Sequence, residues 1–137
     1  MSTHIRRVDY FYTTVQDRPG ESHKILALLA EVGVNLLAVM SIPVGPSRTQ
    51  LTLFPADSNN LVGIAEGAGM IMDGPHPALL VQGKDEIGAV AEVHAKLAAV
   101  GVNVFASTGV TDGEGAFGYV LYVRPEQYDL ATSTLGI

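Results

Sequence analysis

The chain contains no cysteine and no tryptophan, and only 16% of its 137 residues are charged. The absence of cysteine excludes disulfides, thiolate nucleophiles and cysteine metal sites, and it agrees with a reducing compartment. The eight Lys and Arg residues are outnumbered by fourteen Asp and Glu, and Arg6-Arg7 is their only basic pair. A continuous basic stripe, which a nucleic-acid backbone requires, is therefore missing. We expect no nucleic-acid partner.

Long hydrophobic runs are also missing. The most apolar stretch, residues 25–44, is interrupted by Glu31, Gly33, Asn35 and Pro43, whereas a membrane-spanning helix needs about 20 apolar residues. The basic N-terminal segment is not followed by the apolar core of a signal peptide. We expect a cytoplasmic protein without a membrane partner.

Catalytic and metal-binding motifs are equally scarce. The four histidines have no close metal-ligand spacing: His4, His23, His76 and His94. The chain has no nucleophile elbow, no P-loop and no His-Glu-x-x-His. Gly113-x-Gly115-x-x-Gly118 lies in an expected hairpin and does not lead into a helix, so it is not a dinucleotide fingerprint. We expect no catalytic residues, no metal and no cofactor.

What the chain does have is an internal repeat. Asp17, Gly20 and Asn35 recur, each 68 residues later, as Asp85, Gly88 and Asn103. A fixed offset of this kind indicates one supersecondary unit used twice. Asp73-Gly74-Pro75-His76-Pro77 is the expected linker, which predicts a first domain over residues 1–73 and a second over 74–137.

Hydrophobic periodicity predicts the same order of elements in both copies. Runs rich in β-branched and aromatic residues indicate strands, and i, i+3, i+4, i+7 spacing indicates helices. In the first copy the strands are expected at 8–16, 35–42, 48–54 and 70–72, with helices over 21–32 and 58–66. In the second copy the strands are expected at 78–82, 102–110 and 116–123, with helices over 87–100 and 126–134. The prediction is an α+β protein made of two tandem ferredoxin-like βαββαβ domains, in which the helices cover one face of an antiparallel sheet.

The second copy is truncated, because too few residues follow its last helix to form a fourth strand. The edge formed by Ala78–Gln82 is apolar and uncharged, and an edge of this kind invites pairing with another strand. Its cover is expected to be the N-terminal segment around residues 5–12, the residues 70–72, or a second chain. The second chain would make a homodimer, which we favour, with its contact at this edge or instead at the helical surfaces or the strand at 35–42.

The Asp-x-x-Gly loop before the first helix of each copy is the strongest candidate for binding chemistry. Glycine allows a ligand to approach the backbone, and the free amides of a helix N-terminus attract a carboxylate. Asp17 or Asp85 is suited to accept from an ammonium group, so the loop fits a zwitterion. The alternative is a tight turn in which the Asp side chain caps the helix. Asn35 and Asn103 either hydrogen-bond a ligand held by the neighbouring copy or fasten the turn before their strand.

These motifs together resemble the ACT domain, the amino-acid-binding regulatory module of many metabolic enzymes. The first copy shows the likeness in Asp17-Arg18-Pro19-Gly20, in the helix carrying Ile25, Leu29 and Val32, and in Gly33-Val34-Asn35-Leu36. The second shows it in Asp85-Glu86-Ile87-Gly88 and Gly101-Val102-Asn103-Val104, so the likeness covers nearly the whole chain.

The resemblance implies two ACT-like domains paired side by side, with effectors bound between the first loop of one domain and the second strand of its neighbour. It implies these ligand-binding residues: Asp17, Gly20, Glu21, Ser22, Asn35, Asp85, Gly88, Ala89, Val90 and Asn103. Two departures from the family pattern predict unequal sites, one of them empty. Ser22 stands where the family has an apolar residue, and Ile87 replaces the usual proline.

The expected function is a non-enzymatic regulatory protein that binds a small molecule, an amino acid, and reports it to a separate enzyme or regulator. One alternative is a ligand-free interaction module. Another is a small ferredoxin-like enzyme, which would need titratable groups converging in one pocket.

Overall fold

The computed structural model describes residues 3–137, which form an α+β protein with six strands, four α-helices and one short 3₁₀ helix. The elements follow in the order β1 (His4–Gln16), α1 (Glu21–Glu31), β2 (Leu36–Pro43), β3 (Arg48–Pro55), α2 (Ser58–Gly67), β4 (Asp73–Lys84), α3 (Ala89–Ala99), β5 (Val104–Thr111), β6 (Ala116–Val123), η1 (Pro125–Gln127) and α4 (Tyr128–Leu135). None of the helices within this described part is long and apolar enough to cross a membrane.

The chain divides into two compact units. The first unit is Asp9–His76, and the second unit combines residues 3–8 with Pro77–Ile137. Two strands therefore contribute to both units: β1 up to Val8 and β4 from Pro77 onward belong to the second. The sequence favoured a division at residue 73 and gave the N-terminal residues to the first copy.

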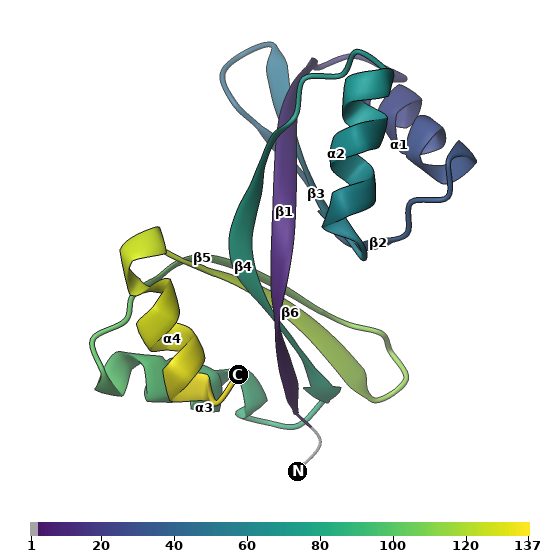
Figure 1. Cartoon of the computed structure of the whole chain (residues 1–137). Helices are drawn as coiled ribbons and strands as arrows, with labels where there is room; N and C mark the ends of the chain where they lie inside the picture. Colours follow the sequence, from purple (N-terminus) through teal and green to yellow (C-terminus); the bar gives the residue numbers. More distant parts are fainter. Residues whose placement is uncertain (1–2) are drawn as a thin grey trace. The chain divides into compact units, whose positions relative to one another are not determined.

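The first unit has the element order βαββαβ, with neighbouring strands in the order β2-β3-β1-β4. Both β1 and β2 pair antiparallel with β3, and Phe11 faces Leu53 in the register of β1 and β3. α1 and α2 lie on one face of these strands (Figure 1). Leu29 of α1 and Leu61 of α2 join the core that also contains Phe11 and Leu53. Apolar side chains recur about every 3.6 residues in the helices and every second residue in the strands, so both sets face the same core.

The second unit is built on β4, β6 and β5, which pair antiparallel in that order. α3 and α4 cover one face (Figure 1). Its core combines Leu79 of β4, Leu97 of α3, Leu121 of β6 and Ala131 of α4, all with no measurable exposure.

The N-terminal part of β1 supplies the strand that the second copy lacks. β1 is the hydrogen-bonded neighbour of β4, and Ile5 packs against the core of the second unit. The Arg7 guanidinium donates to the Ile137 carbonyl at 3.2 Å and lies 5.8 Å from the centre of the Tyr128 ring. The N-terminal segment therefore covers the edge formed by Ala78–Gln82. The exposed-edge argument for a second chain was wrong, because this segment comes from the same chain.

Two local predictions near residue 73 were also wrong. Residues 70–72 are not a strand, and the expected linker is the beginning of β4. Gly and Pro here favour a turn, but contacts with β1 override that preference. The Thr13 hydroxyl donates to the Ile71 carbonyl at 2.8 Å, and the Tyr12 hydroxyl donates to the Asp73 carboxylate at 2.5 Å.

Backbone hydrogen bonds recur at the offset of the sequence repeat. Val34 N donates to Leu29 O at 2.8 Å, and Val102 N donates to Leu97 O at 2.9 Å. The register of the outer strand pair also shifts once in each copy, after Leu36 in β2 and after Val104 in β5. The same sequence signals therefore produce the same local structure twice.

Candidate functional site

The first Asp-x-x-Gly loop connects β1 to α1 and is tied to the β2–β3 turn. Asp17 N donates to Ser47 O at 2.9 Å, and Gly20 begins the helix with φ 87°, a left-handed conformation that favours glycine. Within residues 3–137 no hydrogen bond joins the Asp17 side chain to α1, so the alternative in which Asp17 caps the helix is wrong. The amides of Ser22 and His23 have no acceptor within the helix, because they belong to its first turn.

The second loop repeats this geometry between β4 and α3. Asp85 N donates to Gly115 O at 2.9 Å, and Gly88 begins α3 with φ 84°. α3 also has no side-chain cap. The first-turn amides of Val90 and Ala91 are consequently open to an external acceptor.

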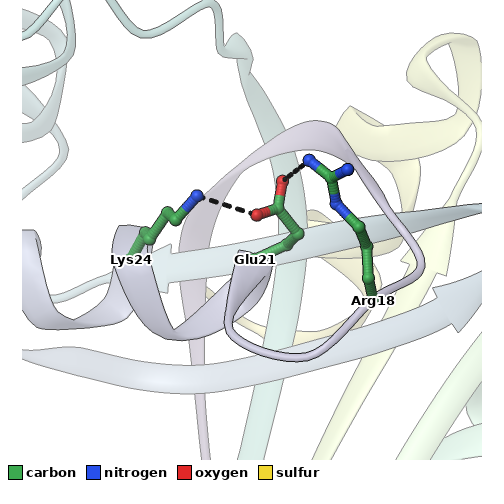
Figure 2. A network of polar contacts seen from close by, with 3 residues as sticks. All are labelled: Arg18, Glu21 and Lys24. Carbon is green, nitrogen blue, oxygen red and sulfur yellow. Dashed lines mark hydrogen bonds and ion pairs between the residues drawn. The ribbon is translucent and has the colours of Figure 1, made fainter.

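An ion-pair network occupies the start of α1. Figure 2 shows the Glu21 carboxylate between two cations: one oxygen lies 2.9 Å from Lys24 Nζ and the other 3.5 Å from Arg18 Nη2. The Glu21 side chain is 18% exposed, against 61% for Arg18 and 73% for Lys24. The hydrogen bond from Lys24 is the main cause that lowers the pKa of Glu21. Glu21 is thus already satisfied by residues of its own loop.

The space beside the two loops differs. Next to the first loop is a polar surface depression of about 520 Å³, lined by Gln16, Asp17, Arg18, Ser47 and Arg48. Next to the second is a groove of about 390 Å³, a size within the usual range for small-molecule sites. Its lining residues are Asp85, Glu86, Ala89, Val90, Gly109, Val110, Thr111, Phe117, Gly118 and Tyr119.

One wall of this groove is a fixed aromatic ring. The Tyr119 hydroxyl and His94 Nε2 share a hydrogen bond of 2.7 Å, which anchors the ring against α3. A Cβ atom at position 109 would lie only 2.7 Å from Tyr119 Cδ1, so Gly109 of β5 leaves the space that the ring needs. An isolated glycine in a strand often marks such a close approach. Sequence reasoning had this signal but did not use it, and it missed Tyr119 and Phe117 as well.

In each copy the asparagine, Asn35 or Asn103, lies at the opposite end of the helix from the glycine loop. Each follows the C-terminal end of its helix, whereas the loop precedes the N-terminal end, and a helix of 11 residues is about 16 Å long. Both residues are exposed, and neither side chain forms a hydrogen bond with residues 3–137. Only their backbones are engaged, since Asn35 O accepts from Ala56 N and Asn103 N donates to Gln127. The alternative that these side chains fasten the turn was wrong.

A further polar cluster in the first unit was not anticipated. His76 Nε2 lies 2.8 Å from one oxygen of Asp73, and the Tyr12 hydroxyl donates to the other. The His76 ring lies against Tyr10 and Tyr12, with ring centres 5.2 and 5.5 Å apart. The hydrogen bonds from Tyr12, first, and His76 lower the pKa of Asp73.

Comparison with known proteins gives structural similarity only. No protein-family model and no curated protein matches the chain. The protein BT0572 from Bacteroides thetaiotaomicron has a similar structure, with a TM-score of 0.81 at 14% identity, covering 96% of this chain and 88% of that one. The ligand-free regulatory subunit of aspartate kinase from Thermus thermophilus gives a TM-score of 0.65 at 16% identity, covering 98% and 95% of the two chains. The corresponding subunit from Thermus flavus gives 0.60, also at 16% identity.

At these identities the similarity shows the fold alone. It supports an ACT-like fold, the fold to which the sequence motifs also point. The similar chains include two regulatory subunits of aspartate kinase.

Proposed function

We propose that this chain is a non-enzymatic regulatory protein of two ACT-like domains that binds an amino acid and acts on a separate enzyme or regulator in the cytoplasm. The similarity to regulatory subunits of aspartate kinase supports the regulatory role. The observation that carries the amino-acid part is the groove at the second loop. Open helix amides, two carboxylates and apolar walls meet there, and these are the groups that a zwitterion with a side chain requires.

The test is a ligand screen on the purified full chain. Thermal unfolding is measured with each of the twenty amino acids, and hits are confirmed by calorimetric titration. A ligand at 100 times its Kd stabilises the folded state by about 2.7 kcal/mol. Stabilisation by one amino acid or a few related ones is the expected result. A flat response to all twenty would contradict the proposal and favour the ligand-free interaction module.

We also infer a homodimer, with domains paired side by side, as the ACT resemblance implies. Support comes from the outer strands β2 and β5, which lie at the ends of the strand order and carry no charged residue over eight positions each. Uncharged edges of this length are prone to pair with another strand. Light scattering on the purified protein checks this, and a monomeric mass at high protein concentration would contradict it.

A further inference from the structure

The two copies of the loop differ at one decisive position. Glu21 at the start of α1 corresponds, at the offset of 68, to Ala89 at the start of α3. The Glu21 carboxylate forms ion pairs with both Arg18 and Lys24 at the start of α1 (Figure 2). Ala89 has no polar side chain to form such a network, and it lines the groove instead. The start of α1 therefore carries its own ion pairs, while the start of α3 has no such network within the described residues.

The charges around the two loops are also different. Arg18 and Arg48 line the depression at the first loop, and their equivalents at the second are Glu86 and Ala116. Asp85 and Glu86 line the groove, and no lining residue in the described chain is a Lys or Arg. The second loop is thus suited to an ammonium group, and the first is not.

The side chains that line the two sites differ as well. Phe117 and Tyr119 line the groove, and their equivalents in the first copy are Thr49 and Leu51. Val110, on β5, is 72% exposed beside the groove. An apolar ligand side chain placed here would remove apolar surface from water on both sides, which favours binding.

We propose that the second copy alone binds the ligand, and that it selects an α-amino acid with an uncharged, apolar side chain. The ammonium group pairs with Asp85 and Glu86, and the carboxylate accepts from the amides of Val90 and Ala91. The side chain packs on Val110 and Phe117. This inference rests on the proposed function and adds to it the occupied copy and the class of side chain.

Charged side chains are selected against. The carboxylates at the groove repel the side chain of an aspartate or glutamate ligand. Both carboxylates pair with the α-ammonium group, so the apolar walls leave the side-chain charge of a lysine ligand without a partner. A charge held against apolar walls without a partner costs free energy.

The experiment is calorimetric titration of the full chain with leucine, valine, phenylalanine, aspartate and lysine as free amino acids. The variant Ala89→Glu gives the second loop the residue of the first. A glutamate in the first turn of a helix is favourable, so α3 is expected to persist. The matched control Ala95→Glu makes the same change at an exposed position further along α3. We expect affinity for an apolar amino acid to fall at least about tenfold in Ala89→Glu and to stay within about twofold of wild type in Ala95→Glu.

A second measurement does not depend on a variant. In methyl NMR spectra, the apolar amino acid should shift the Val90 and Val110 signals and leave those of Ile42, the counterpart of Val110 in the first copy, unchanged. Undiminished affinity in Ala89→Glu, a preference for aspartate or lysine, or shifts at Ile42 in place of Val110 would overturn this inference and leave the proposed function standing. Absence of binding to every amino acid would overturn both.

Discussion

Gly20 and Gly88 show how one residue type fixes the geometry of both candidate loops. Each begins a helix with φ near 85°, and an added Cβ would meet no atom within 4 Å at either position. The requirement for glycine is therefore conformational and not steric.

Replacing Gly20 or Gly88 by Ala should lower the free energy of unfolding by about 1–2 kcal/mol, the cost of a left-handed conformation for a residue with a Cβ. Gly63→Ala is the control. Gly63 lies inside α2 with open space around it and no left-handed φ, so alanine there should stabilise by about 0.5–1 kcal/mol. Urea denaturation measures both effects. Equal effects at all three sites would contradict the assignment.

Asp73 gives a pH prediction. Because its pKa is lowered in the folded state from the ordinary value of 3.8, its stabilising effect is complete above that value and is lost as pH falls through the lowered pKa. We expect the stability advantage of wild type over Asp73→Asn to shrink as pH falls through this lowered pKa. Tyr12→Phe, which removes the main cause of the shift, should reduce this dependence. Thermal unfolding from pH 2.5 to 7 tests it, and a difference that grows toward low pH would contradict it.

At the scale of the elements, η1 forms side-chain hydrogen bonds to a distant segment, which local sequence patterns do not predict. η1 begins with Pro125 in its first turn, where a proline is tolerated. The Gln127 side chain then reaches back to the segment between α3 and β5. Its Nε2 donates to Gly101 O at 3.0 Å, and its Oε1 accepts from Asn103 N at 3.1 Å. One side chain thereby satisfies two backbone groups of the segment between α3 and β5.

Gln127→Ala should destabilise the second unit by about 1–2 kcal/mol, because two hydrogen bonds with backbone groups are lost. Glu126→Ala, at the exposed neighbouring position, is the control and should change stability by less than about 0.5 kcal/mol. Urea denaturation followed by circular dichroism provides the comparison. If both variants unfold at the same urea concentration, the Gln127 contacts do not stabilise the protein.

At the scale of the whole molecule, the first unit is one continuous stretch of the chain, whereas the second unit is assembled from two. Residues 3–8 belong with Pro77–Ile137, although nearly seventy residues separate the two stretches. Ile5 lies against the core of the second unit, whereas the neighbouring Arg6 is exposed. The alternation of a strand thus places one residue in the core and the next in solvent.

Ile5→Asp should lower the free energy of unfolding of the second unit, because a carboxylate beside an apolar core is poorly solvated. Amide exchange at Ala78–Gln82 should then be faster than in wild type, since the neighbouring strand is held less firmly. Arg6→Asp is the matched control and should leave this exchange unchanged. Hydrogen exchange with mass spectrometry makes the measurement. The same exchange rate in all three proteins would contradict the role of residue 5.

The sequence by itself determined the local structure of this protein and the identity of its repeated loops. Helical spacing at Ile25 and Leu29, strand composition and turn glycines act over short distances, so both copies show them directly, although Val32 of the same pattern lies after α1 and is exposed. Tertiary structure alone decided which strand covers Ala78–Gln82, why Asp73 lies in a strand, and where Gly109 and Tyr119 line a groove. Each of these depends on residues far apart in the chain, whose pairing and packing free energies override local preference.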